Sequence, residues 1–333
     1  MGNQVQEKIF KMNPNHYWDS KLFTKIFDLK STSFSWENHL QQLKKSNKEF
    51  SFLVVYGSQI VYSDNPFGFS QIDDFLKINI EKLIHKKIYI IQIHDSKSNL
   101  KLNLTQSIFM IHENIVISQS SSWLEIQSNK KFNYTHFVTN LNDNIFYQDI
   151  IVDHYKKSSC YFLQNQQLSK NKINQKHLLH TASNINIFCI NKITPKQTRD
   201  DYIEIEHLEK DTHSSIDYLS LNGGKSVSQV NSFINKLAFN SETHQHIKHL
   251  LITENAQSFS KPTLMIDNPL VVASHGNSIG SYSEEDLFYL MQRGLSTQRA
   301  KEIIQNGLMI KLFNEHYYFE KLTQYFNTGK LYE

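Results

Sequence analysis

Short stretches in which apolar and polar residues alternate dominate the middle of the chain, between about residues 100 and 280. In residues 202–206, Tyr-Ile-Glu-Ile-Glu, the isoleucines would lie on one face of a strand and the glutamates on the other. Similar stretches recur roughly every 8 to 15 residues. They predict strands at residues 107–112, 115–118, 123–127, 184–190, 202–208, 216–221, 246–253 and 263–267.

No helical pattern alternates with these strands, which argues against a doubly wound α/β sheet. A sandwich, a barrel and a β-solenoid all fit the spacing, and no strict sequence repeat selects among them. The pattern alone therefore predicts a mostly β core and leaves its architecture open.

The first hundred residues have a mixed pattern. Ser35 is a typical N-cap for a helix that runs to Leu43, and residues 72–83 predict a second short helix. Residues 52–56 and 88–93 are short apolar runs rich in β-branched residues, and they predict buried strands. We therefore predict an N-terminal mixed helical and strand region at residues 1–100, followed by the β core at residues 101–280.

After Gly280 the pattern takes a helical period. Ser283, followed by three acidic residues, predicts the start of a helix that ends at Gly294. Ser296 is the expected N-cap of a second helix, which Gly307 should end before a last helix rich in leucine and aromatic residues. Residues 281–333 are therefore predicted to form a C-terminal helical region.

Charge and composition exclude several classes of function. The 35 basic residues exceed the 32 acidic residues by only three and are spread along the chain, which argues against nucleic-acid binding. No segment approaches 18 consecutive apolar residues, so no membrane association is expected. The two cysteines exclude a disulfide framework and an all-cysteine cluster site. We expect a cytoplasmic protein, with a plastid-like organelle as the alternative.

The segment 222–226, Asn-Gly-Gly-Lys-Ser, is similar to the end of a phosphate-binding loop. The required earlier glycine is replaced by Leu219, and the residues that follow predict a strand where a helix should begin. The segment instead predicts a hairpin turn in which Gly223 and Gly224 supply positive φ angles.

Other candidate groups have simple structural explanations. His244 and His246 would share one face of a strand and could ligate a metal, but no cysteine or carboxylate pair completes a ligand set beside them. Glu204 and Glu206 are typical of a solvated strand face. Cys189 alternates with isoleucines and should point into the core, whereas Cys160 follows two serines and should be more exposed. No catalytic residue is therefore predicted.

Residues 261–294 contain an ordered series of motifs that begins with a strand. The strand precedes a glycine-flanked segment that contains His275, which we predict to be a tight turn. An acidic helix start and a Leu-Phe-Tyr-Leu-x-x-Arg-Gly run follow. The series reads Lys261-Pro262-Thr263-Leu264-Met265-Ile266, Ser274-His275-Gly276, Gly280, Glu284-Glu285-Asp286 and Leu287-Phe288-Tyr289-Leu290-Met291-Gln292-Arg293-Gly294.

The order and spacing of these motifs resemble the SufB/SufD family of iron–sulfur cluster assembly proteins, and within it the SufD branch. The resemblance continues more faintly upstream and covers about residues 105 to 320. It implies a right-handed parallel β-helix core, an N-terminal mixed α/β region and C-terminal helices. It also implies pairing with a SufB-like scaffold through the β-helix, and docking of a SufC-like ABC-type ATPase on the helices.

The resemblance also implies which residues act. His275, flanked by Ser274 and Gly276, would lie at the subunit interface where clusters form, and it is the candidate metal ligand. The candidate residues for ATPase docking are Glu284, Gln292, Arg293 and Gln298. The chain would not be an enzyme and would bind no cofactor tightly by itself, while iron or a nascent cluster could lie at the interface with the scaffold.

Three alternatives remain open. A SufB-like scaffold would hold the cluster itself, but this chain has no cysteine after Cys189, where such scaffolds carry theirs. A carbohydrate-active protein on a β-helix would need clustered carboxylates in a groove. A plain interaction module without a metal role is the third alternative.

Overall fold

The computed structural model describes residues 35–313, except 66, 73, 82, 84–85, 141–143, 156–158 and 168–169. Every described residue belongs to one structural unit. The part of the predicted last helix beyond position 313 lies outside the described residues.

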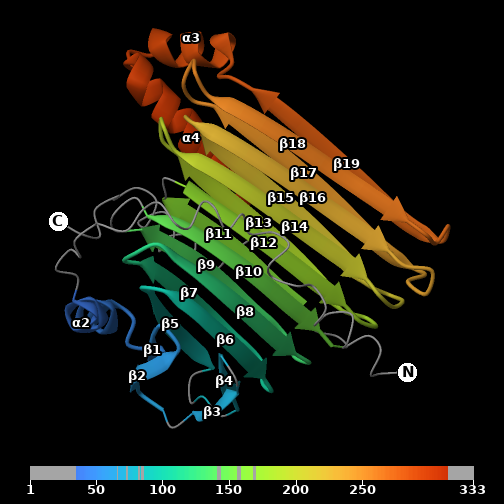
Figure 1. The fold of residues 1–333 in the computed structure, drawn as a ribbon. Helices are drawn as coiled ribbons and strands as arrows, with labels where there is room; N and C mark the ends of the chain where they lie inside the picture. Colours follow the sequence, from blue (N-terminus) through green and yellow to red (C-terminus); the bar gives the residue numbers. More distant parts are fainter. Residues whose placement is uncertain are drawn as a thin grey trace. The chain divides into compact units, whose positions relative to one another are not determined.

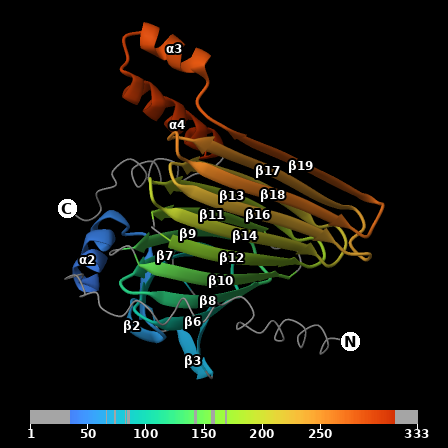
Figure 2. The ribbon, with the colours of Figure 1, turned by 45° about the horizontal axis from the view of Figure 1, so that its top comes forward.

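Nineteen strands in the described part of the chain form two sheets that face each other (Figures 1 and 2). Sheet A has ten strands, in the spatial order β19-β17-β15-β13-β11-β9-β7-β5-β1-β2. Its strands are β1 (Ser51–Tyr56), β2 (Gln59–Ser63), β5 (Lys87–His94), β7 (Ile108–Val116), β9 (Phe132–Asn140), β11 (Ser159–Gln167), β13 (Asn184–Ile193), β15 (His213–Asn222), β17 (Ser241–Leu251) and β19 (Val271–Gly280).

Sheet B has nine strands, in the spatial order β18-β16-β14-β12-β10-β8-β6-β4-β3. Its strands are β3 (Gly68–Ile72), β4 (Phe75–Ile80), β6 (Lys97–Leu104), β8 (Ser120–Ser128), β10 (Ile145–His154), β12 (Lys170–Leu179), β14 (Thr198–His207), β16 (Lys225–Ile234) and β18 (Gln257–Ile266).

From β4 onward the chain passes alternately between the two sheets. From β5 onward each strand pairs in parallel with the strand two places earlier or, for β5, with β1, whereas β4 pairs with β3 in antiparallel orientation. The result is a β-solenoid in which two consecutive strands make one coil. The predicted mostly β fold with a parallel β-helix core is therefore confirmed, and the choice between sandwich, barrel and solenoid is resolved. The parallel pairing begins at β1, well before residue 101.

Inward side chains of successive coils stack in rows along the solenoid. One row consists of Ile187, Ile216, Gln245 and His275, which are register partners on β13, β15, β17 and β19. The first three members are buried, whereas His275 is exposed because β19 is the edge strand of sheet A. The same row therefore changes from core to surface at the end of the stack.

Several local predictions are confirmed. Ser35 caps α2 (Trp36–Ser46), and Ser283 caps α3 (Glu284–Gln292) by accepting a hydrogen bond from the Asp286 backbone N–H. Gly294 follows α3 with φ +86°, and Ser296 accepts a hydrogen bond from the Arg299 backbone N–H at the start of α4 (Thr297–Phe313). Figure 1 shows α2 and α3 at opposite ends of the stack of coils.

Two predicted helix positions are wrong. The second N-terminal helix, at residues 72–83, is replaced by β4, because β6 supplies a parallel partner for its backbone groups. Gly307 does not end a helix, since α4 runs through it from Thr297 to Phe313. No helix in the described ranges is both long and apolar enough to span a membrane.

Gly223 and Gly224 do not form a hairpin, because they connect β15 of sheet A to β16 of sheet B at a corner of the solenoid. Neither glycine has a positive φ. A Cβ at Gly224 would lie 2.3 Å from the Gln197 carbonyl oxygen of the preceding coil. Glycine is needed at this corner because two backbones approach closely.

The opposite corner contains an alanine in the left-handed region. Ala182, Asp211 and Asn240 have φ values of 59°, 57° and 56° and occupy equivalent positions in three successive coils. The Asn240 side chain donates a hydrogen bond of 2.7 Å to Asp211 Oδ1 in the coil before it. Alanine gains no such bond and pays the steric cost of this conformation.

We therefore expect Ala182→Asn to stabilise the protein by about 0.5 to 1 kcal/mol, because asparagine tolerates positive φ and can bond across the corner to Asp211. Ala182→Val should destabilise it, since β-branched residues fit this region worst. Chemical denaturation of the three proteins measures both effects. Equal stability of the asparagine variant and the natural protein would contradict the prediction.

Candidate functional site

The solenoid ends in an incomplete coil, because β19 adds a strand to sheet A for which the described residues form no counterpart in sheet B. Both β18 and β19 are edge strands among those that the structure describes, so one side of each carries backbone groups that no described strand pairs. Large apolar side chains are exposed on these two strands. They are Phe259, Met265, Ile266, Val272 and Ile279. We call this end of the solenoid, formed by β18 and β19, the open mouth.

His275 lies in the middle of β19, in register with Gln245 of β17. The predicted tight turn at Ser274-His275-Gly276 is therefore wrong, because all three residues are part of an extended strand. His275 belongs to the inward row, but no further coil within the described ranges covers it. Its imidazole is exposed at the open mouth.

Ser274 and Gly276 belong to the other face of β19, which is the outer face of sheet A. Ser274 Oγ lies 2.6 Å from His244 Nδ1, and His244 Nε2 lies 2.5 Å from Glu242 Oε1. His244 and His246 share this face as predicted, and His246 pairs with Asp217 at 3.4 Å. Within the ranges that the structure describes, no three His, Cys, Asp or Glu side chains form a set that could hold a metal ion.

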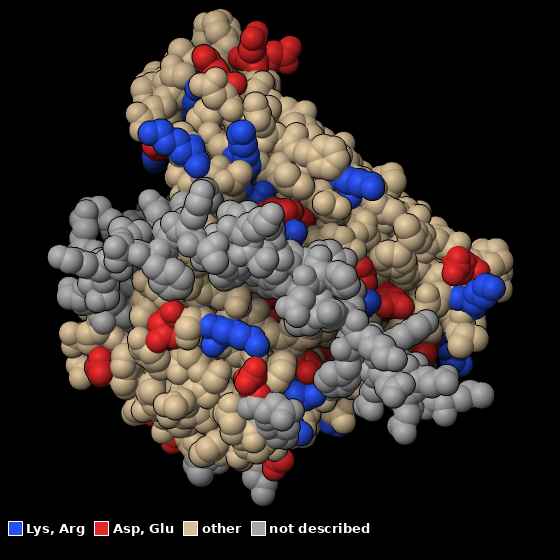
Figure 3. Space-filling view, in the orientation of Figure 1, with Lys and Arg blue, Asp and Glu red and all other residues tan. Residues whose placement is uncertain are grey.

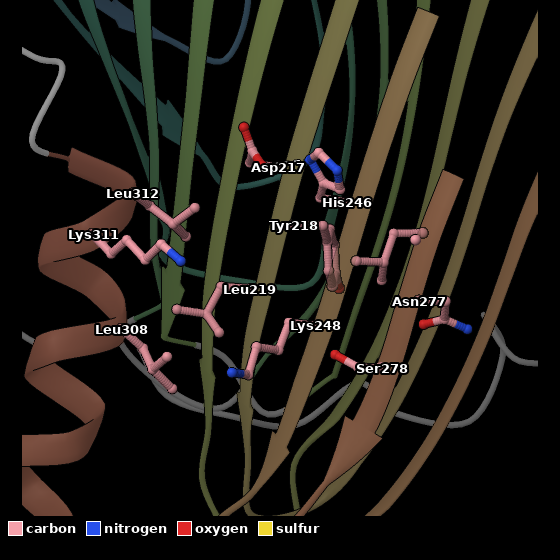
Figure 4. A pocket seen from close by; sticks show the side chains of 12 residues that line it. Asp217, Tyr218, Leu219, His246, Lys248, Asn277, Ser278, Leu308, Lys311 and Leu312 are labelled. Atoms are coloured by element: carbon pink, nitrogen blue, oxygen red, sulfur yellow. Dashed lines mark ion pairs between the residues drawn. The ribbon is translucent and has the colours of Figure 1, made fainter. Parts of the chain in front are cut away.

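A groove of about 610 Å³ lies between α4 and the outer face of sheet A. Leu308, Lys311 and Leu312 of α4 form one wall, and Lys248 extends from the sheet (Figure 4). Gly276 contributes no side chain to the groove, and a Cβ there would make only an ordinary contact of 3.5 Å with His246. The groove is therefore on the opposite face of β19 from His275.

Helix α3 has no buried residue. Its acidic first turn lies at the top of the space-filling view (Figure 3), and Phe288, Tyr289 and Met291 are exposed along the helix. An apolar helical surface of this kind is typical of a protein interaction site. Helix α4, in contrast, lies against the end of the strands near β17 (Figure 2). Its Met309 packs in a cluster with Leu219 and Leu221 of sheet A.

The four predicted docking residues lie on these helices. Glu284 and Gln292 are the first and last residues of α3, and Arg293 follows as its C-cap, with its guanidinium 5.1 Å from the Tyr289 ring centre. Gln298 lies in the first turn of α4 and bonds to Glu302 at 3.4 Å. All four are exposed, and the structure places them on the helices and not with His275 on the mouth strand.

The sequence interpretation missed a set of buried histidines inside the solenoid. Each lies on an inward position, and most bond to neighbouring polar side chains; His112 Nε2, for example, lies 2.9 Å from Gln92 Oε1. The set consists of His94, His112, His136, His154, His177, His207 and His249. Burial lowers the pKa of each one, to about 3 for His154 and to about 4 for His207. Strand parity would have identified His207, which continues the isoleucine face of residues 202–206.

The interior also contains a buried ion pair. Arg199 Nε donates to Asp201 Oδ2 at 2.7 Å, and the Tyr218 hydroxyl and the Asn191 amide donate to the same oxygen at 2.7 and 2.9 Å. These distances are typical of good hydrogen bonds. Cys189 lies in this region and is buried, as predicted, and its burial raises the pKa of the thiol. A thiol in this state is a poor nucleophile. The side chain of Cys160 lies outside the described residues.

Glu204 and Glu206 both form ion pairs with Lys176, at 2.7 and 3.1 Å. The prediction of a solvated face is wrong for Glu204, whose side chain is buried beside this lysine. This pairing agrees with a structural role on the outer face of sheet B. The arrangement best suited to function is therefore the open mouth, with edge strands, exposed apolar side chains and one imidazole, together with the exposed helix α3.

A comparison with protein families matches residues 124–308, more than half of the chain, to the SufBD core domain of the SUF system for iron–sulfur cluster assembly. The matched region contains most coils of the solenoid, the open mouth and α3.

Curated relatives match shorter segments. An iron–sulfur cluster assembly SufBD family protein of Porphyra purpurea is 27% identical over 121 residues, which cover 36% of this chain and 25% of the relative. The iron–sulfur cluster assembly protein SufD of Bacillus subtilis is 31% identical over 78 residues, covering 23% and 18%. A SufBD family protein of Archaeoglobus fulgidus is 39% identical over 66 residues, covering 20% and 18%. These matches span a quarter or less of the relatives' lengths.

Proposed function

Because this chain belongs to the SufBD family of iron–sulfur cluster assembly proteins, we propose that it is the SufD-like subunit of an assembly complex. In this role it pairs with a SufB-like scaffold and with a SufC-like ABC-type ATPase. It is not itself an enzyme and holds no cofactor of its own, and the nascent cluster is the cargo of the complex.

The open mouth is the observation that carries this proposal. Edge strands with unpaired backbone groups readily accept further strands, and five large apolar side chains are exposed beside them. A second solenoid of the same family could continue the two sheets across this end. His275 would then lie at the seam between the subunits.

At such a seam His275 would supply an imidazole nitrogen to iron or to the growing cluster. Iron–sulfur clusters also need thiolate ligands, and this chain has no cysteine after Cys189. The buried Cys189 thiol is held away from the mouth in the protein interior. This arrangement supports a SufD-like partner more than a SufB-like scaffold, which would contribute the thiolate.

The exposed surface of α3 supports the second interface. Phe288 and Tyr289 offer apolar area, and Arg293 lies beside the Tyr289 ring at the end of the helix. An ATPase bound there would lie on residues that directly follow β19 in the chain. Movement of the ATPase could therefore reach the mouth through the short segment between Gly280 and Glu284.

We expect Ile279→Lys to weaken binding of a SufB-like partner by about tenfold or more, because a charge would replace an apolar side chain at the mouth. Ile279 is 45% exposed, so the free protein should still fold. Phe69→Lys is the matched control, since Phe69 is 66% exposed but lies on β3, the far edge of sheet B. Titration calorimetry with the scaffold measures both. Equal affinities of the two variants would contradict the proposed interface.

A further inference from the structure

Gln245 is a fully buried glutamine directly beneath the open mouth. Its Nε2 donates hydrogen bonds to Ser232 Oγ at 2.7 Å and to the Thr263 carbonyl oxygen at 3.2 Å. A backbone carbonyl can only accept, so the amide nitrogen must point toward Thr263. The orientation of the amide is thereby fixed, and Oε1 must point away from these two groups.

Further hydrogen bonds hold Gln245 in this position. Ser232 Oγ also accepts from Thr243 Oγ1 at 2.9 Å, and Ser214 Oγ donates to Thr243 Oγ1 at 2.7 Å. His207 Nε2 lies 3.0 Å from Ser214 Oγ. The amide is therefore anchored to three successive coils and has little freedom to rotate.

Gln245 Oε1 is buried and has no hydrogen-bond donor among the described residues. A buried acceptor that receives no hydrogen bond lowers the stability of the folded state by about 1 to 3 kcal/mol, because it has lost its hydrogen bonds to water. A donor is therefore expected nearby. The residue stacked on Gln245 in the next coil is His275, its register partner on β19.

The imidazole N–H of His275 can serve as this donor, because His275 lies in the same inward row as Gln245. Both side chains point inward from adjacent strands, whose separation is close to 4.8 Å in any β-sheet. No hydrogen bond joins the His275 imidazole to another described residue. One rotation of the imidazole would bring a ring N–H toward Gln245 Oε1.

We propose that Gln245 is a positioning residue for His275. Its fixed Oε1 accepts the N–H of one imidazole nitrogen, which selects a single neutral tautomer and directs the other nitrogen, with its lone pair, out of the mouth. Histidines that bind metals commonly donate their second N–H to such an acceptor. The inference rests on the proposed function only in assigning the outward nitrogen to iron or the nascent cluster.

The tautomer can be measured on the isolated chain with ¹⁵N-labelled histidine by NMR, at about pH 8, above the ordinary histidine pKa. The His275 ring signals are assigned by their loss in His275→Asn. We expect one tautomer in the natural protein and a mixture of two in Gln245→Met, which keeps the side-chain length but removes the acceptor. Gln229→Met, on the outer face of β16, is the control and should change nothing.

An unchanged tautomer ratio in a folded Gln245→Met variant would overturn the inference. It would mean that in the natural protein a water molecule, and not His275, donates to Gln245 Oε1. Should that variant unfold, Gln245→Glu keeps an acceptor oxygen at the same position and is expected to retain the single tautomer. Loss of the single tautomer in a folded Gln245→Glu protein would equally overturn the inference.

Cluster formation in the reconstituted complex separates this inference from the proposed function. We expect Gln245→Met to slow it about 10- to 100-fold, in the range typical of residues that orient metal ligands. A rate that falls in His275→Asn but not in Gln245→Met would refute the positioning role alone. A rate that falls in neither variant, with the tautomer change present, would refute the proposed role of His275 and leave the hydrogen bond standing.

Discussion

Lowering the pH from about 7.5 to 5.5 should strongly destabilise this protein. The seven histidines buried inside the solenoid are neutral in the folded state, and burial holds the pKa of His94 and His249 at about 4 and that of His136 and His154 at about 3. The unfolded chain has ordinary histidine pKa values near 6.5 and therefore binds more protons below that pH. Stability is fully present above pH 6.5 and is lost as the pH falls toward the folded values.

Each such histidine should cost about 1.4 kcal/mol of stability by pH 5.5, so several together exceed the total stability of many domains. Chemical denaturation between pH 8 and 5 measures the effect. In His249→Gln the pH slope should fall by about one proton, because one buried histidine fewer takes up a proton on unfolding. A stability that stays constant over this range would contradict the buried, neutral assignment.

Asp201→Ala should destabilise the protein by about 3 to 5 kcal/mol, because it leaves the buried Arg199 guanidinium without its partner. The hydroxyl of Tyr218 and the amide of Asn191 would lose an acceptor as well. Changing both charged residues, as Arg199→Met with Asp201→Leu, should recover a large part of the loss. In that double variant no buried charge remains.

Asp200→Ala is the matched control for this experiment. Asp200 is the neighbouring residue on β14 but lies on the outer face, where its partner Lys172 is 3.5 Å away and both side chains are partly exposed. Its loss should cost at most about 1 kcal/mol. Urea denaturation compares the variants. If Asp200→Ala and Asp201→Ala lowered the free energy of unfolding by similar amounts, the prediction that the buried ion pair matters more than the exposed one would be wrong.

Strand positions could be predicted from the sequence wherever one face is apolar and the other polar, as in residues 202–206 within β14. Caps could be predicted for the same reason, since Ser283 bonds to a backbone N–H only three residues away. Both features depend on neighbours in the chain. They need no knowledge of distant strands.

Features that depend on distant strands could not be predicted in this way. Residues 75–80 form β4 only because β6 pairs with them. The segment around His275 forms a strand only because it pairs with β17. The solenoid itself was expected from the family resemblance and not from periodicity. The coils differ in length, because the register partners Lys87 and Phe109 are closer in the sequence than the partners Ser241 and Val271. The sequence therefore has no constant repeat that would reveal the solenoid.

The candidate site likewise combines features that depend on chain neighbours with features that depend on distant strands. The motif residues from Lys261 to Gly294 identified the correct part of the chain, but the exposure of Phe259 and Ile279 follows from where the stack of coils ends. Gln245 had no local signal either. Its interest arises from its register with His275 and from an oxygen that lacks a donor.

The most direct test of this account is to co-express the tagged chain with the SufB-like and SufC-like proteins of the same source and to analyse the purified material by native mass spectrometry. We predict one complex that contains all three proteins and that loses the SufB-like subunit when the chain carries Ile279→Lys. Purification of the chain without either protein, under conditions in which both are expressed and soluble, would contradict the proposed role in cluster assembly.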